Sequence, residues 1–346
     1  MRLAKLLTWV CLYCSTTLVA PAWSQGTPYA GKTIRIIVGA GAGGTYDIWA
    51  RILARHMGKY VPGNPNFIVQ IMSGAGALVA TNYVYNVASQ DGLTMLIPNS
   101  NIYMEQLLGT SEAKFDVRKF NWIGAQMKDQ LVLFARSDSP YKSVDHIVKA
   151  QEPPKCGASG VGSAGYLLPK IIEEVTGAKF IIIRGYQGAK ESDLAVERGE
   201  LHCKGTTITA YFAREPYLGW RKKNFVLDLA QTPTKRDAKL PDTPTIYELM
   251  DRYRTADLNR RVAKVLAAGG ELGNPLAVGP GVSPERVRIL REAFAKTLKD
   301  AEVIAETNKA RLDIDSSTGE ETQSMMRNSV SESMEVVNRI RAILRD

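Results

Sequence analysis

Histidine is scarce in this sequence, and His56, His146 and His202 are the only three among 346 residues. His56 falls in a predicted helix and His202 in a predicted strand, and none has a partner at the spacing of a metal site or catalytic triad. Enzyme motifs are missing beyond residue 24: there is no H-E-x-x-H, no C-x-x-C pair and no Walker sequence, and Ser159 lacks a G-x-S-x-G context. We therefore expect no catalytic residue, no metal and no cofactor.

Basic runs interleaved with aromatic residues are also absent, which argues against nucleic-acid binding despite a formal net charge of +9. We expect most lysines and arginines on solvated helix faces, although a basic protein also favours anionic ligands. Repeats, low-complexity tracts and long linkers are absent. The roughly 320 residues after the first 24 exceed what one hydrophobic core usually holds, so we expect two lobes.

A long uninterrupted apolar run is missing, because the apolar segment 6–20 is too short and too interrupted for a membrane span. This segment follows Arg2 and Lys5 and precedes the small-x-small tripeptide at 22–24. The pattern predicts a secretory signal peptide, residues 1–24, removed near Ser24. No cysteine follows a lipobox-like triplet, so we expect an exported chain without a lipid anchor.

Cysteine is scarce as well, and only Cys156 and Cys203 remain of four once the signal peptide is removed. Each lies at the end of a short predicted strand. In an oxidising compartment the two can pair and close a loop of about 48 residues, which the chain-entropy model values at roughly 4 kcal/mol. The alternative is two buried free thiols.

The strongest positive signal is a glycine loop between a β-branched strand, 33–38, and an amphipathic helix, 45–58. Its glycines are Gly39, Gly41, Gly43 and Gly44. Glycines let the backbone approach a ligand closely, and the first N–H groups of the helix point at it, so this arrangement is typical of an anion site. Thr45 is a suitable N-cap, and Asp47 suits the helix dipole and can pair with Arg51. A second loop of this kind occupies 155–168.

Three of these glycines, Gly39, Gly41 and Gly44, fit the G-x-G-x-x-G fingerprint of dinucleotide sites. That fingerprint requires an acidic residue about 20 residues later for the ribose. None occurs between Asp47 and Asp91, which argues against a nucleotide. A simple tight turn remains an alternative to the anion site.

Strand and helix patterns alternate along most of the chain, which favours an α/β fold with parallel sheets. The first region predicts strands at 33–38, 67–71 and 93–97 with helices at 45–58, 75–87 and 101–109. The second predicts strands at 131–134, 154–157, 179–183, 201–205 and 225–229 with helices at 143–150, 163–176 and 188–198. The remainder predicts helices at 244–253, 257–268 and 283–299, a strand at 274–278, and one long amphipathic helix from Gly319.

Eight short motifs, in order, resemble those of the substrate-binding receptors of tripartite tricarboxylate transporters, also called Bug proteins. They are Ala42-Gly43-Gly44-Thr45-Tyr46-Asp47 with Ala50-Arg51, Gly74-Ala75-Gly76-Ala77, Asp91-Gly92-Leu93-Thr94, Phe115-Asp116, the loop 157–163, Tyr186-Gln187-Gly188, the segment 240–245, and Pro280-Gly281-Val282-Ser283-Pro284. Together they cover essentially all of the mature chain. Ala42 and Ala77 depart from the family pattern, which has proline and glycine there.

The resemblance implies a periplasmic binding protein of the type II fold, with two lobes, each a mainly parallel sheet flanked by helices, and a ligand cleft between them. Residues 25–133 with 266–346 would form lobe I, and residues 134–265 lobe II. A small organic carboxylate would be held by backbone amides and short polar side chains, and membrane transporter subunits would be the partner. We expect a monomer. Alternatives are a receptor-like protein for signalling or protein contact, or an exported enzyme that uses the glycine loops as an anion site.

Candidate ligand contacts lie at the carboxyl ends of predicted strands, where open α/β sheets bind ligands. In lobe I they are Gly43, Gly44, Thr45, Tyr46, Gly74, Ala75, Gly76, Ala77, Ser100 and Asn101. In lobe II they are Ser159, Gly160, Gly162, Ser163, Gln187, Gly188, Thr206 and Thr207. Asp47 is interpreted as structural. Four tyrosines are candidates to line the cleft and favour an aromatic or apolar ligand tail: Tyr46, Tyr103, Tyr166 and Tyr186.

Overall fold

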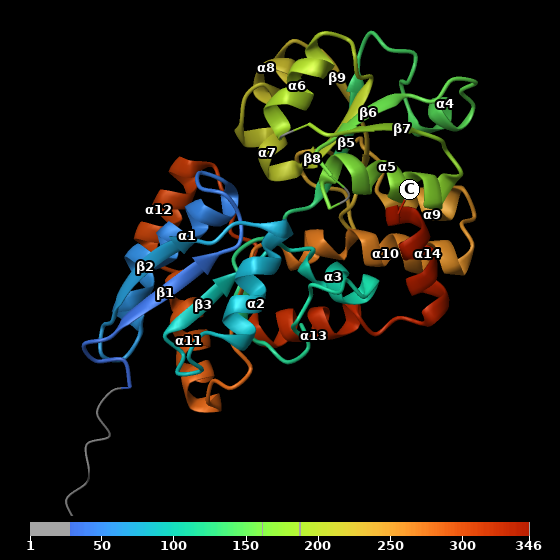
Figure 1. Ribbon diagram of the computed structural model, residues 1–346. Helices are drawn as coiled ribbons and strands as arrows, with labels where there is room; N and C mark the ends of the chain where they lie inside the picture. Colours follow the sequence, from blue (N-terminus) through green and yellow to red (C-terminus); the bar gives the residue numbers. More distant parts are fainter. Residues whose placement is uncertain (1–27, 161, 187, 346) are drawn as a thin grey trace, which may run out of the picture.

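The computed structural model describes residues 28–160, 162–186 and 188–345, and its strands form two separate sheets (Figure 1). The predicted signal peptide, residues 1–24, lies outside the described residues, as does Gln187. Within the part described, no helix combines the length and apolar character needed to cross a membrane.

The first sheet has six strands in the spatial order β11-β4-β10-β3-β1-β2. Their bounds are β1 Thr33–Val38, β2 Asn66–Ile71, β3 Thr94–Ile97, β4 Asn121–Ala125, β10 Pro275–Val278 and β11 Ser317–Thr318. Strand β1 is parallel to both β2 and β3, whereas β10 is antiparallel to β3 and β4, and β11 is antiparallel to β4.

The second sheet has five strands in the order β7-β6-β8-β5-β9. Their bounds are β5 Leu131–Arg136, β6 Lys155–Ala158, β7 Ile181–Arg184, β8 Cys203–Thr207 and β9 Val226–Gln231. Strand β6 is parallel to β7 and β8, whereas β5 is antiparallel to β8 and β9.

The α/β architecture with two sheets is confirmed, but both sheets are mixed rather than mainly parallel. Two of the antiparallel strands, β5 and β10, each follow a crossing of the chain from one sheet to the other, whereas β11 follows β10 within the first sheet. Alternating strand and helix patterns reveal parallel units built within one sheet, but they carry no signal for the direction of a strand that arrives from elsewhere.

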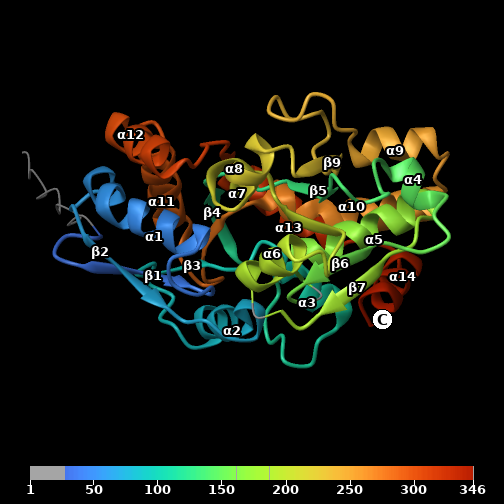
Figure 2. The same ribbon diagram turned by 90° about the horizontal axis from the view of Figure 1, so that it is seen from above.

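Helices cover the sheets and form two bodies (Figures 1 and 2). The first body surrounds the six-stranded sheet with α1 Thr45–His56, η1 Met57–Tyr60, η2 Ala75–Ala77, α2 Leu78–Asn86, α3 Ile102–Leu108, α11 Pro284–Thr297, α12 Ala301–Ala310 and α13 Gly319–Ser329. The second body surrounds the five-stranded sheet with α4 Val144–Val148, α5 Ala164–Thr176, α6 Ala189–Glu197, α7 Ile208–Ala213, α8 Tyr217–Lys222 and α9 Ile246–Arg252.

Two further helices, α10 Asp257–Leu272 and α14 Met334–Arg345, contact both bodies. Tyr103 of α3 donates a hydrogen bond to the Val265 carbonyl of α10 at 2.6 Å, and α10 also packs along α5. In α14, the Ile343 carbonyl accepts from Tyr166 of α5, while Arg341 donates to the Leu108 carbonyl of α3.

The C-terminal region differs from the single long helix expected from Gly319, because α13 ends at Ser329 and α14 begins at Met334. Ser331 donates its hydroxyl to the Arg327 carbonyl, and the Ser333 hydroxyl accepts from the Val336 N–H. Serine side chains compete with the helix for its backbone groups and favour its ends, which accounts for the break. Met334, the first residue of α14, is 62 % exposed.

Close backbone packing seats the start of α5 on strands β6 and β8. A Cβ at Gly165 would lie 2.2 Å from the Gly157 carbonyl oxygen, and one at Gly205 would lie 2.4 Å from the Ala164 carbonyl oxygen. Only glycine leaves room for this approach. The contact fixes the helix start beside the carboxyl ends of the two strands.

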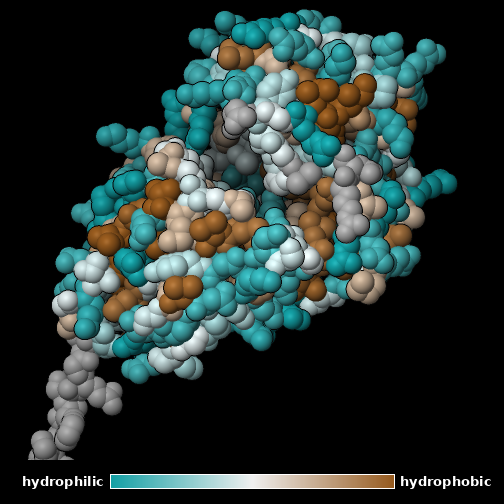
Figure 3. All heavy atoms as spheres, viewed as in Figure 1, coloured by the Kyte–Doolittle hydropathy of each residue, from teal (hydrophilic) through white to brown (hydrophobic). Residues whose placement is uncertain are grey.

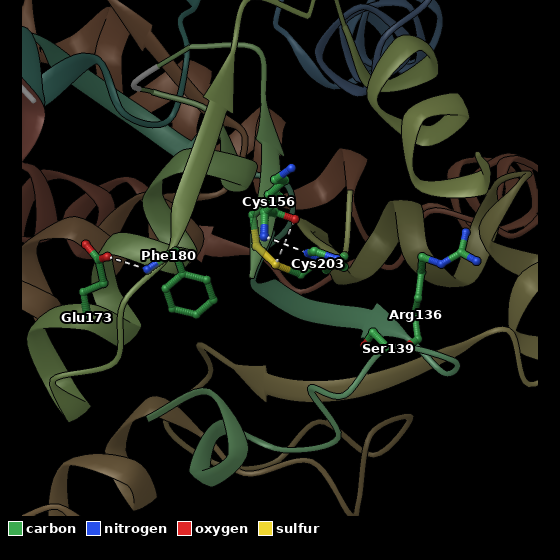
Figure 4. Close-up of a disulfide and its surroundings, with 8 residues drawn as sticks. Arg136, Ser139, Cys156, Glu173, Phe180 and Cys203 are labelled. Atoms are coloured by element: carbon green, nitrogen blue, oxygen red, sulfur yellow. Dashed lines mark hydrogen bonds between the residues drawn. A yellow bond between two sulfur atoms is a disulfide. The ribbon is translucent and has the colours of Figure 1, made fainter. Parts of the chain in front are cut away.

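A disulfide joins the same two strands. Cys156 of β6 and Cys203 of β8 are direct register partners with Cα atoms 4.6 Å apart, and both are fully buried (Figure 4). The bond therefore closes the loop that contains α5, β7 and α6.

We predict that Gly165→Ala lowers the free energy of unfolding by about 1–3 kcal/mol, because the added methyl overlaps backbone that cannot move aside. Chemical denaturation of the purified protein measures this change. Gly160→Ala is the matched control, since no atom lies within 4 Å of a Cβ at that position. Equal stability of the two variants would contradict the packing argument.

We predict that replacing Cys156 and Cys203 together by serine lowers the free energy of unfolding by about 4 kcal/mol, because the unfolded chain loses its cross-link. Denaturation with and without dithiothreitol measures the effect. Reductant should lower the stability of the wild type and leave the double variant unchanged. A wild type insensitive to reductant after prolonged incubation in denaturant would contradict this prediction.

Candidate functional site

Two segments carry the chain between the bodies, and they are hydrogen-bonded to each other. The Gln126 N–H donates to the Asn274 carbonyl at 3.3 Å, and the Asn274 N–H donates to the Met127 carbonyl at 3.2 Å. The Asp129 N–H donates to the Gly270 carbonyl at 2.8 Å. This pairing forms a short two-stranded connection beside the end of α10.

A cavity of about 310 Å³ opens between the two bodies above this connection, where the space-filling view shows a hollow (Figure 3). Loops after β1 and β3 line it from the first body, and the start of α5 with the end of β8 lines it from the second. Its lining includes Thr45, Tyr46, Asn99, Ser100, Asn101, Asp129, Gly162, Ala164, Thr206, Thr207, Arg214, Gly269 and Gly270. The volume lies at the lower end of the range of small-molecule sites, roughly 300–1,000 Å³.

A smaller cavity of about 140 Å³ adjoins the first and shares Ala164, Thr206 and Thr207 with it. It lies at the N-termini of α5 and α6, and its lining also includes Ser159, Ser163, Gly188, Ser192 and Lys204. The first N–H groups of a helix have no carbonyl partner within it and attract anions. Two such helix starts therefore meet in this cavity.

The structure brings many of the predicted contact residues together. Thr45, Tyr46, Ser100, Asn101, Gly162, Thr206 and Thr207 line the larger cavity, and Ser159, Ser163 and Gly188 line the smaller one. Gly160 lies between them in sequence, and Gly43 and Gly44 immediately precede Thr45. The loop 74–77 contributes to neither lining, and Gln187 lies outside the described residues. Ligand contact by each of these residues stays a prediction.

Asp47 has a structural role at the start of α1. Its carboxylate accepts the Gly43 N–H at 2.7 Å and pairs with Arg51 at 2.9 Å. Burial raises the pKa of Asp47, but the Gly43 N–H and Arg51 favour the charged form more strongly, so the pKa lies below its usual value. The N-cap is Gly44 rather than Thr45, which leaves the Thr45 hydroxyl free to face the second body.

Two hydrogen bonds cross between the bodies at the larger cavity. Arg214, after α7, donates to the Thr45 hydroxyl at 3.0 Å. Asn101 donates through Nδ2 to the Gly162 carbonyl at 3.3 Å. These contacts hold the two bodies together around the cavity.

Of the four tyrosines considered for the cleft, Tyr46 lines the larger cavity, with its hydroxyl donating to Ser100 Oγ and accepting the Ser100 N–H. Tyr103 and Tyr166 are wrong as cleft residues, because both are buried in the core and donate to the backbone of α10 and α14. Tyr186 packs beside the apolar cluster around Phe134. Among the described residues, Tyr46 is the one of these four tyrosines that lines the larger cavity.

Lys204 lies in the smaller cavity but has its donors occupied. Its ammonium donates to Asp193, to the Tyr217 hydroxyl at 3.1 Å and to the Ala189 carbonyl at 3.1 Å. An ammonium has three donors, so these bonds use all of them. Lys204 therefore acts as an internal support for the start of α6, rather than as a free cation for a ligand.

Sequence reasoning missed the two charged residues of the larger cavity, Asp129 and Arg214. Asp129 precedes β5, and because β5 is antiparallel to β8, the start of β5 lies at the edge where β8 ends. Arg214 follows α7, a helix that the sequence pattern did not predict. Knowledge of the direction of β5 would have placed Asp129, but no local signal in the sequence gives that direction.

The Asp129 carboxylate has an unusual environment. Its Oδ1 atom is buried and has no hydrogen-bond partner among the described residues. Burial raises the pKa of Asp129 to about 6, although the nearby hydroxyls of Thr207 and Thr209 and the charge of Arg214 favour the ionised form.

Elsewhere, His56, Asp300 and Glu302 lie close enough to hold a metal ion. However, the ammonium of Lys59 pairs with both carboxylates, and His56 Nε2 lies 2.9 Å from Glu306. The cluster is thus an ion-pair network that ties η1 to α12.

Comparison with known proteins identifies the family. A model of the tripartite tricarboxylate transporter family receptor matches residues 49–341. A curated relative, "UPF0065 protein in gbd 5'region" from Cupriavidus necator, is 30 % identical over 286 residues, which cover 80 % of this chain and 78 % of the relative.

Two solved structures share the fold. A TctC solute binding protein from Polaromonas, with no ligand, matches with a TM-score of 0.69 and 21 % identity over 92 % of this chain and 99 % of its own. The R. palustris protein Rpa4515 with adipate matches with a TM-score of 0.65 and 18 % identity over 90 % and 98 %. The extent of the family match shows that this chain belongs to the tripartite tricarboxylate transporter receptor family.

Proposed function

We propose that this protein is a periplasmic receptor that captures a small organic carboxylate between two lobes and delivers it to membrane subunits of a tripartite tricarboxylate-type transporter. The observation that carries the proposal is the polar cavity between the two sheets, lined from both bodies by loops at the ends of strands. In open α/β sheets, this is the place where ligands bind.

The chemistry of the two adjoining cavities supports a carboxylate. Helix starts at α5 and α6 supply N–H groups, and the hydroxyls of Ser159, Ser163, Thr206 and Thr207 surround them. Arg214 is the one cation among the described residues that line the larger cavity. Backbone N–H groups, hydroxyls and a guanidinium are the donors that bind a carboxylate in proteins.

Capture by closure of the two lobes is supported by the connection and the contacts across the cavity. We propose residues 25–133 with 266–346 as lobe I and residues 134–265 as lobe II, although the whole of β5, Leu131–Arg136, belongs to the second sheet. The bonds from Arg214 to Thr45 and from Asn101 to Gly162 would form as the lobes meet. Burial of a ligand between them would add contacts from both sides.

The proposed periplasmic location is supported by the family and by the sequence. A receptor that serves a transporter acts outside the inner membrane, which agrees with the predicted signal peptide, and the disulfide suits an oxidising compartment. Rpa4515 of R. palustris is described with adipate, a small dicarboxylate. We propose a binding role, without catalysis, for a monomeric protein.

We predict that a thermal-shift screen of the mature protein against small organic acids finds a stabilising ligand. At a hundred times its dissociation constant a ligand stabilises the folded state by about 2.7 kcal/mol, which raises the melting temperature measurably. Amines without a carboxylate serve as the control panel. A folded protein that responds to no acid would contradict the proposed function.

We predict that Ser159→Asp weakens binding of the acid found in that screen by at least about tenfold, because it places a negative charge among donors arranged for an anion. Isothermal titration calorimetry measures the change. Ser89→Asp is the matched control, since Ser89 is exposed in a loop outside both cavity linings. Unchanged affinity in Ser159→Asp would exclude the smaller cavity from the binding site.

A further inference from the structure

The larger cavity contains two buried acceptor atoms that have no hydrogen-bond partner among the described residues. Asp129 Oδ1 is buried without a hydrogen-bond partner, although Asp129 lines the cavity. A buried carboxylate oxygen without a partner is costly, and native structures rarely keep one without a purpose. Asn101 Oδ1, in the same lining, is also buried without a partner. Two acceptors at one cavity therefore lack a donor.

Charged side chains of both signs also line the larger cavity. Asp129 is the one anion and Arg214 the one cation among the described residues that line it, and no ion pair joins them within the described part of the chain. Arg214 donates instead to the neutral hydroxyl of Thr45, so its charge is not neutralised there. The cavity thus presents a positive and a negative group that are close enough to interact but are not joined in an ion pair.

We propose that the ligand of this receptor is a zwitterion, an α-amino acid, with its ammonium bound by Asp129 and its carboxylate bound on the side of Arg214 and Thr45. This inference rests on the proposed function and names the class of carboxylate. A protonated amine supplies the donors that Asp129 Oδ1 and Asn101 Oδ1 lack. A ligand of zero net charge at these two groups matches a cavity with one charge of each sign.

A dicarboxylate without an amino group fits this cavity less well. It would place a second negative charge near Asp129 and leave the unpartnered oxygen unsatisfied. Such a ligand becomes acceptable only when Asp129 takes up a proton and can itself donate a hydrogen bond. The two ligand classes therefore respond to pH in opposite directions.

The carboxyl group of Asp129 changes its charge between pH 5 and 7. Burial raises the pKa of the neighbouring Tyr46 hydroxyl, so this hydroxyl stays neutral. The hydroxyls of Thr207 and Thr209 do not titrate. With a pKa of about 6, Asp129 is mostly charged at pH 7 and mostly neutral at pH 5. The ammonium and carboxylate of an amino acid do not change charge in this interval.

Matched pairs of ligands test the proposal. Each common L-amino acid is titrated by calorimetry beside its deaminated counterpart, such as aspartate with succinate and glutamate with glutarate, and malate is added as a hydroxy acid. We expect one amino acid to bind about tenfold more tightly than its counterpart at pH 7, as a hydrogen bond to a charged group provides. Its affinity should fall roughly tenfold at pH 5, while that of the counterpart rises.

The same titrations are repeated with the variant Asp129→Asn. The control is Asp242→Asn, which changes an exposed aspartate. The variant should remove both the preference for the amino acid and the pH dependence. If the wild type binds succinate, malate or another deaminated acid as tightly as its amino counterpart, the zwitterion proposal is overturned while the carboxylate receptor stands. An unchanged preference in Asp129→Asn would also overturn it. If no member of any pair binds, the proposed function fails and the inference fails with it.

Discussion

The hydrogen-bonded pairing of residues 126–129 with 270–274 is the constraint on which the arrangement of the two bodies depends. Its tightest point is Gly273, with φ of +54°, where a Cβ would lie 1.6 Å from the Met127 carbonyl oxygen. Only glycine permits both this backbone conformation and this approach. Because the pairing leads directly from β4 into β5 and from α10 into β10, it brings the strand ends of both sheets to one cavity.

Close approach through glycine recurs at each boundary of that cavity. Gly165 and Gly205 let α5 rest on β6 and β8, while Gly269 leaves space for the Asn101 side chain, whose Oδ1 would lie 1.8 Å from an added Cβ. Backbone N–H groups therefore come within reach of a small ligand without long side chains between. Among the described residues, the charged side chains that line this cavity are Asp129 and Arg214.

The sequence predicted the parts of this site that are local. Strand β1, the helix that follows it and the second glycine loop were predicted within a few residues, because periodic apolar residues and glycines mark them directly. The Asp47–Arg51 pair follows from helical spacing alone. The positions of Asp129 and Arg214, and the burial of Tyr103 and Tyr166, depend on how strands from distant parts of the chain pair. No local sequence pattern encodes that pairing.

Helix α14 has a consequence for how the protein can move. Through Arg341 it holds α3 of the first body, and through Ile343 it holds α5 of the second, so it braces both on one side of the molecule. The contacts from Arg214 to Thr45 and from Arg311 to the Ala213 carbonyl join the bodies without such a brace. Any separation of the bodies that preserves α14 must therefore be a one-sided rotation, with a mouth that widens between α1 and α7 while the braced side acts as the pivot.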